Sequence, residues 1–231
     1  MTRLKLLLLS SVLSLLAACG GGGGGGSSGP VTSTETFQLQ TAYVNFFNAS
    51  NSLPYTISGT SSGYAVTGSG TLTESSPVNG TFESVSALQK NSANTFTITA
   101  NGITASDASS SSSYVDSNYI PLGHSGTEYT VITGNVVIPM TARIGDSGTW
   151  STENRYTNSS KTSLLGTTTT TYVLEPDTAS TALLKIIDTE KNTSGTTTAT
   201  TVETYRITPA GSITHVSATI SKSPTYLTFT F

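Results

Sequence analysis

The side chains that could bind a metal or act as acid and base are few and form no recognised pattern. The chain has two histidines, His124 and His215, and neither lies near another ligand at a zinc-binding spacing. Four acids form two close pairs, Glu175 with Asp177 and Asp188 with Glu190. These pairs could bind calcium or serve as acid and base, but no loop around them supplies further oxygen ligands in order. We therefore predict no metal site and expect the paired acids to be solvated turn residues.

A possible nucleophile stands in Gly145-Asp146-Ser147-Gly148, which resembles the nucleophile segment of chymotrypsin-like serine proteases. The resemblance implies Ser147 as the nucleophile, with a histidine far upstream that follows Thr-Ala-Ala. Here His124 follows Leu122-Gly123 and lies close by, whereas His215 comes afterward. Because Gly-Asp-Ser-Gly is also a good turn sequence, we expect a turn, assign no catalytic residue and keep a serine hydrolase as an alternative.

Four aromatic residues could form a shelf for a sugar or a peptide: Tyr119, Tyr129, Trp150 and Tyr156. In a β-sheet such side chains more often pack in the core or across neighbouring strands. We expect the packing role.

The N-terminus has the three parts of an export signal. Arg3 and Lys5 precede a run of low polarity from Leu6 to Leu16, and the small residues Ala17 and Ala18 follow it. This run is too short for a transmembrane helix, which needs about 20 apolar residues. Residues 1–18 are therefore expected to be a signal peptide.

Cys19 is the only cysteine, and Leu16-Ala17-Ala18-Cys19 resembles the lipobox of bacterial lipoproteins. The resemblance implies that the Cys19 thiol receives a diacylglyceryl group, that cleavage occurs just before it and that the freed amine is acylated. Gly20, in place of aspartate, resembles lipoproteins forwarded to the outer membrane. Two or three acyl chains would meet the usual requirement of two signals for stable anchoring. The alternative is an ordinary secretory signal with a chance cysteine.

Residues 19–35 have the composition of a flexible tether. Gly20 to Gly26 are seven consecutive glycines, and Ser27-Ser28-Gly29-Pro30 follows them. In this respect the chain resembles an uncharacterised group of glycine-tethered proteobacterial lipoproteins. The root-mean-square reach of the tether is on the order of 20 to 25 Å, so the domain is expected to hang beside the bilayer.

Charge and thiol content narrow the range of partners. Without residues 1–18 the chain has eight basic and thirteen acidic side chains, a net charge near minus five, and no basic run. This argues against nucleic acid as a partner. A lipidated Cys19 leaves no thiol for disulfides, zinc or catalysis. The expected partners are a membrane, through the lipid anchor, and an unidentified protein or ligand, with no cofactor.

Strand patterns dominate from Thr36 onward. Apolar and polar residues alternate over residues 37–40, 64–66, 95–100, 167–174, 201–207, 214–220 and 227–231. Turn sequences such as Asn101-Gly102 and Thr208-Pro209-Ala210-Gly211 join consecutive strands, which must then be antiparallel neighbours. We predict a mainly β domain, an antiparallel meander sheet that forms a sandwich or a half-barrel.

Irregular segments are harder to assign. No segment clearly predicts a helix, and the best candidate, residues 82–90, fits a strand nearly as well. Residues 109–113 are all serine and are expected to be a linker or a mobile loop. Residues 36–231 thus form the β domain, and its division near residues 107–113 stays open.

Three functional hypotheses follow. The first is a non-enzymatic cell-envelope lipoprotein, at the outer membrane, whose β domain binds a partner or has a structural role. The second is a carrier in which a curved sheet shields an apolar ligand, as in the lipoprotein-handling half-barrels that the chain loosely resembles. The third is the serine hydrolase.

Overall fold

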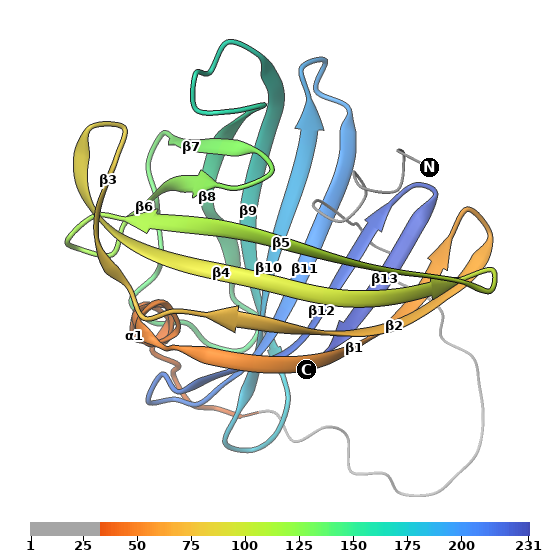
Figure 1. The fold of residues 1–231 in the computed structure, drawn as a ribbon. Coiled ribbons are helices and arrows are strands. Elements are labelled where there is room, and N and C mark those ends of the chain that lie inside the picture. Colours follow the sequence, from red (N-terminus) through yellow and green to blue (C-terminus); the bar gives the residue numbers. More distant parts are fainter. Residues whose placement is uncertain (1–32) are drawn as a thin grey trace, which may run out of the picture.

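The computed structural model describes residues 33–231, which form one helix and 13 strands (Figure 1). The signal peptide, Cys19 and the glycine run all lie outside the described residues. No helix in the described part of the chain is long and apolar enough to cross a bilayer.

The elements follow one another along the chain with short connections. Their bounds are α1 (Leu39–Asn48), β1 (Asn51–Ser61), β2 (Tyr64–Glu74), β3 (Val78–Phe82), β4 (Val85–Ala100), β5 (Ile103–Val115), β6 (Pro121–Ser125), β7 (Tyr129–Thr133), β8 (Ser147–Tyr156), β9 (Leu164–Pro176), β10 (Ala182–Asn192), β11 (Thr197–Ile207), β12 (Ile213–Lys222) and β13 (Thr225–Thr230). All pairings are antiparallel, and most strands pair with their neighbours in sequence. The prediction of a mainly β, antiparallel meander is confirmed.

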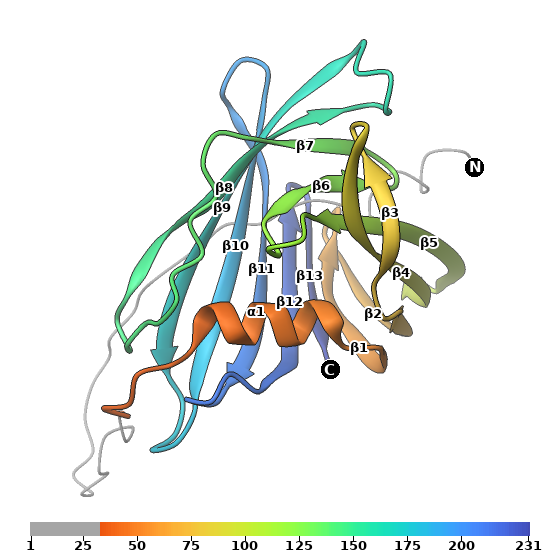
Figure 2. The same ribbon diagram turned by 90° about the vertical axis from the view of Figure 1, so that its left-hand side faces the viewer.

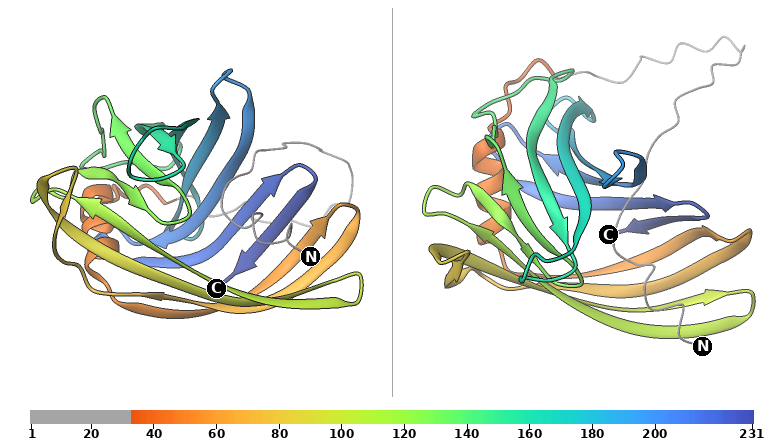
Figure 3. Two further views of the ribbon diagram at one scale, coloured as in Figure 1. Left: turned by 45° about the horizontal axis from the view of Figure 1, so that its top comes forward. Right: turned by 90° about the horizontal axis from the view of Figure 1, so that it is seen from above.

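The sheet closes on itself. β2 pairs with β1 on one side and with β4 on the other, from Val66 opposite Ala100 to Glu74 opposite Ser92. This second pairing makes a closed barrel of twelve strands, with β3 outside the ring (Figure 3). The predicted sandwich or half-barrel is therefore wrong, because the alternation of side chains is the same in an open and in a closed sheet.

Two glycines allow the closing strands to approach each other. A Cβ atom at Gly68 would collide with the Thr97 carbonyl of β4, and one at Gly70 would collide with the Tyr55 ring and the Thr95 carbonyl. Glycine in a strand often marks such a close approach of another backbone. The seam between β2 and β4 thus depends on residues that have no side chain.

Helix α1 lies across one end of the barrel (Figure 2). Its apolar residues follow a helical period: Leu39, Ala42, Tyr43, Phe46 and Phe47. All of them except Phe47 pack against residues of β9, β10 and β11 in the largest core cluster, and Phe47 contacts Tyr119. The strand expected over residues 37–40 is wrong, because only Phe37 forms a bridge, to Ala142, and the helix begins at Leu39.

Two further expectations concern the region around β4 and β5. Residues 109–113 lie inside β5, opposite residues 90–94 of β4, so the expected serine linker is wrong. Serine fits there because its hydroxyl pairs across strands, as Ser112 does with Asn91. Asn101-Gly102 does form the predicted turn, with positive φ at both residues.

Lys90 fixes the end of α1 to the seam of the barrel. It lies on β4 between the stretch that pairs with β3 and the stretch that pairs with β2. Its Nζ donates hydrogen bonds to the carbonyls of Phe46 (2.7 Å) and Ala49 (2.9 Å), at the C-terminal end of the helix. It also lies 3.5 Å from Glu74 Oε2, and both side chains are buried. One ammonium group therefore satisfies helix carbonyls and neutralises a buried carboxylate.

Replacement of Lys90 by Met is expected to lower the free energy of unfolding by about 3 to 5 kcal/mol, because Glu74 would stay buried without a counter-charge. Urea denaturation measures this loss. The matched control is Lys185→Met, which breaks a partly exposed ion pair with Glu175 worth about 0 to 1 kcal/mol. Equal losses in the two variants would contradict the assigned role of Lys90.

Candidate functional site

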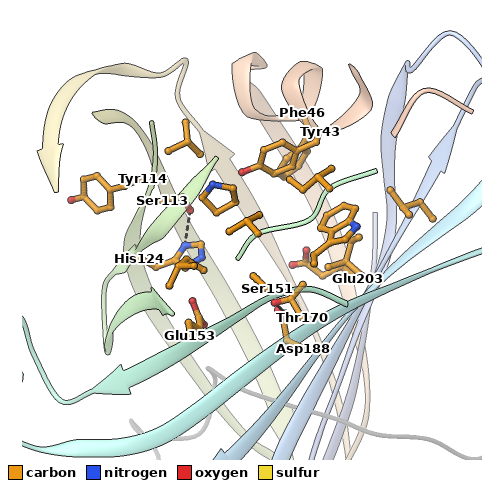
Figure 4. A pocket seen from close by; sticks show the side chains of 18 of the residues that line it. Tyr43, Phe46, Ser113, Tyr114, His124, Ser151, Glu153, Thr170, Asp188 and Glu203 are labelled. Atoms are coloured by element: carbon orange, nitrogen blue, oxygen red, sulfur yellow. Dashed lines mark hydrogen bonds between the residues drawn. The ribbon is translucent and has the colours of Figure 1, made fainter. Parts of the chain in front are cut away.

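A cavity of about 190 Å³ lies inside the barrel next to α1 (Figure 4). Its walls come from α1, from β5 to β12 and from the segment between β7 and β8. The volume corresponds to roughly six water molecules at ~30 Å³ each. It is smaller than the roughly 300 to 1,000 Å³ of pockets for drug-sized ligands, so it suits a small molecule.

The wall on the helix side is apolar. Tyr43 and Phe46 come from α1, and Leu184 and Ile186 come from the inner face of β10. Trp150, the only tryptophan, lies in a bulge of β8 and is 8% exposed. Its ring contacts Tyr43 edge to face, with 6.1 Å between the ring centroids. These side chains form a rigid aromatic and aliphatic surface.

Strand register brings polar side chains to the opposite wall. Ser151, Thr170 and Asp188 lie directly opposite one another on β8, β9 and β10, in one row across the sheet. Glu153 lies one row to one side of Asp188, and Glu203 lies one row to the other side. Side chains two positions apart on a strand share a face, so all five point into the barrel.

Three carboxyl groups line this wall, those of Glu153, Asp188 and Glu203, and we call them the acidic wall. No lysine or arginine lines the cavity in the described part of the chain. Asp188 Oδ1 accepts a hydrogen bond from Thr170 (2.6 Å), and Glu203 Oε2 accepts one from the Tyr205 hydroxyl (2.6 Å). The acidic wall is therefore hydrogen-bonded but has no counter-ion of its own.

The adjacent arginine is already paired with other carboxylates. Arg155 makes two parallel hydrogen bonds of 2.9 Å to Glu128, and its third nitrogen lies 2.6 Å from Glu190. Arg155 and Glu190 are both buried. A guanidinium in such a bidentate pair is not free to turn toward the acidic wall.

Burial raises the pKa of Asp188 to about 7, although the hydrogen bond from Thr170 opposes the rise. The like charges of Glu203, Glu153 and Glu190 raise this pKa further. The Asp188 side chain is partly exposed, but its exposed part faces the cavity and its neighbours there include other carboxyl groups. Its pKa can therefore be raised even though it is not fully buried. Burial and the neighbouring like charges thus disfavour the charged form of Asp188.

The paired acids of the sequence analysis have different fates. Asp188 and Glu190 lie on the inner face of β10, so their expected role as solvated turn residues is wrong. Asp177 does lie in a turn, where it accepts hydrogen bonds from Arg206 and Thr181. Glu175, at the end of β9, forms the exposed ion pair with Lys185. Only the second pair contributes to the cavity wall, through Asp188.

The residues of the hydrolase alternative are held by separate partners. Ser147 is exposed at the start of β8, after the predicted turn, where Gly145 has a φ of +97°. His124 Nδ1 shares a hydrogen bond with Ser113 Oγ (2.9 Å) on the neighbouring strand. His215 stacks between Tyr205 and Phe231. No hydrogen bond joins Ser147 to either histidine within residues 33–231.

The four aromatic residues pack as predicted. Trp150 and Tyr129 belong to core clusters, and Tyr156 packs against one of them. Tyr119 contacts the Phe47 ring and exchanges hydrogen bonds with Asn48 at the end of α1. The acidic wall was not predicted from the sequence. Charged residues two positions apart do mark the inner face of two of its strands, Glu153 with Arg155 on β8 and Asp188 with Glu190 on β10.

No cluster of metal-ligating side chains occurs in the described ranges of the chain. Comparison with protein-family models, with characterised proteins and with solved structures finds no match to the chain. The site must therefore be interpreted from its own geometry.

The raised pKa of Asp188 predicts how stability changes with pH. The folded state holds the proton more tightly than the unfolded state, where the pKa is 3.8, so stability falls as pH rises toward about 7. The groups around Asp188 are Glu153 on β8, Thr170 on β9, Glu190 on β10, Glu203 on β11 and the Arg155 guanidinium beside Glu190.

Between pH 5 and pH 8 the wild type is expected to lose about 1 to 3 kcal/mol of unfolding free energy relative to Asp188→Asn, which cannot ionise. Urea denaturation of both proteins at the two pH values measures this difference. The exposed Asp107→Asn serves as control and should run parallel to the wild type. Parallel behaviour of Asp188→Asn would contradict the burial of this charge.

Proposed function

We propose that the barrel is the ligand-binding domain of a non-enzymatic cell-envelope lipoprotein, and that it carries a small, largely apolar molecule in the cavity next to α1. The observation that carries this proposal is the cavity itself, which has an apolar wall on one side and a few polar groups on the other. Binding sites for small molecules commonly combine these two kinds of wall.

The size of the barrel supports a carrier rather than a purely structural role. Side chains alone fill barrels of about eight strands, whereas larger barrels enclose space for a ligand. Here α1 and the core clusters fill part of a twelve-stranded barrel, and about 190 Å³ stays open. A carrier also needs no catalytic group, and Ser147 forms no hydrogen bond with His124 or His215 within residues 33–231.

Ligand binding can be followed by the emission of Trp150, because this single tryptophan lies in the cavity wall. Hexanol, a neutral probe of suitable size, is expected to change the emission with saturation. Ile186→Phe adds a ring inside the cavity and is expected to weaken hexanol binding at least about tenfold, since overpacking removes the space for the ligand.

The control variant is Ile187→Phe on the same strand. Ile187 points to the outer face, because side chains alternate along a strand. It should bind hexanol as the wild type does. If hexanol produced no saturable change, or if the two variants behaved alike, the cavity would not be the binding site.

We further propose that lipidation of Cys19 anchors the domain to the outer membrane. The support is the lipobox-like Leu16-Ala17-Ala18-Cys19 and the glycine run that follows it. In a Gram-negative host, Cys19→Ser is expected to move the protein from the membrane fraction to the soluble fraction, because no acyl chains remain to partition into lipid. Ser28→Ala, in the same tether, is the control. Unchanged fractionation of Cys19→Ser would contradict the anchor.

A further inference from the structure

We propose that the ligand of the cavity is a cation, a small molecule with a protonated amine that binds against the acidic wall while its apolar part packs against α1. This inference rests on the proposed carrier function and specifies its ligand class.

The charge balance of the cavity is the first argument. Three carboxyl groups line it, and no lysine or arginine does so in the described residues. Burial of unpaired negative charge is costly, and proteins usually offset it with a counter-ion or by protonation. Arg155 is unavailable because Glu128 and Glu190 occupy it. A ligand that brings its own positive charge removes this cost.

The hydrogen-bonding capacity of the acidic wall is the second argument. Asp188 and Glu203 each use one oxygen for a protein donor, Thr170 and Tyr205 respectively, and each keeps its second oxygen. Glu153 forms no hydrogen bond or ion pair with other residues of the described chain. A primary ammonium group is a hydrogen-bond donor only, so it can pair with a carboxyl oxygen that has no protein donor.

The arrangement of the two walls is the third argument. Figure 4 shows Tyr43 and Phe46 on the helix side, and Glu153, Thr170 and Asp188 on the side away from it. A molecule in the cavity therefore contacts aromatic rings at the end next to α1 and the carboxyl groups of Asp188 and Glu153 at the other end. This polarity suits an amphiphile with one charged end, and it disfavours an anion.

The test compares three probes with the same six-carbon chain, hexylamine, hexanol and hexanoate, on the purified full-length protein at pH 8. Trp150 emission and calorimetric titration measure each dissociation constant. Hexylamine, which is protonated at this pH, is expected to bind at least about tenfold more tightly than hexanol, and hexanoate is expected to bind most weakly.

Variants assign the preference to the acidic wall. Asp188→Asn with Glu203→Gln is expected to abolish the tenfold preference for hexylamine over hexanol. Removal of unpaired buried charge is not expected to prevent folding. If this protein nevertheless fails to fold, Glu153→Gln alone should reduce the preference. Asp107→Asn, which is exposed and does not line the cavity, should retain the full preference.

The possible outcomes separate the two proposals. Equal binding of hexylamine and hexanol would overturn the cation inference and leave the carrier function standing. A preference for hexylamine that persists in the acidic-wall variants would also overturn it. Failure of all three probes to bind would overturn both proposals.

Discussion

The hydrogen bonds between β2 and β4 turn a long meander into a barrel, and the interior of the molecule follows from this closure. An open sheet of this length would expose one face to water. The closed sheet instead has an interior that must be filled, and twelve strands enclose more space than the strand side chains occupy. Helix α1 fills one end of that space, and the cavity is what is left. The close approach at Gly68 and Gly70 makes this closure possible.

Electrostatics inside the barrel divides into paired and unpaired groups. Lys90 is buried with Glu74 and holds helix carbonyls, so its charge is compensated and its role is to connect α1 with the seam. Arg155 is compensated by two carboxylates. The acidic wall is not compensated by any residue of the described chain that lines the cavity. The ion pairs of Lys90 and Arg155 thus have both charges supplied by the protein, whereas the acidic wall has only the negative ones.

The acidic wall and the apolar wall come from separate parts of the chain. The acids are on β8, β10 and β11, which lie within four consecutive strands of the sheet, β8 to β11. Tyr43 and Phe46 instead come from α1, near the start of the domain. The helix reaches its place because Phe37 pairs with Ala142 before it and Lys90 holds its end. A ligand in the cavity would therefore contact segments that are more than a hundred residues apart in sequence.

The sequence by itself determined the mainly β class, the antiparallel order, turns such as Asn101-Gly102 and segments of six of the strands, because alternation and turn chemistry are local properties. It did not predict α1, because Gln38 offers no side-chain cap and the first turn has no acidic residue. The start of the helix also coincides with the apolar and polar alternation of residues 37–40, which is typical of a strand. Only the tertiary structure decided that the sheet closes and that Asp188 and Glu190 point inward rather than into solvent. Closure depends on pairing between distant strands. On β10 the apolar residues occupy both faces, Ile186 inward and Ile187 outward, so its alternation does not specify which face the barrel encloses.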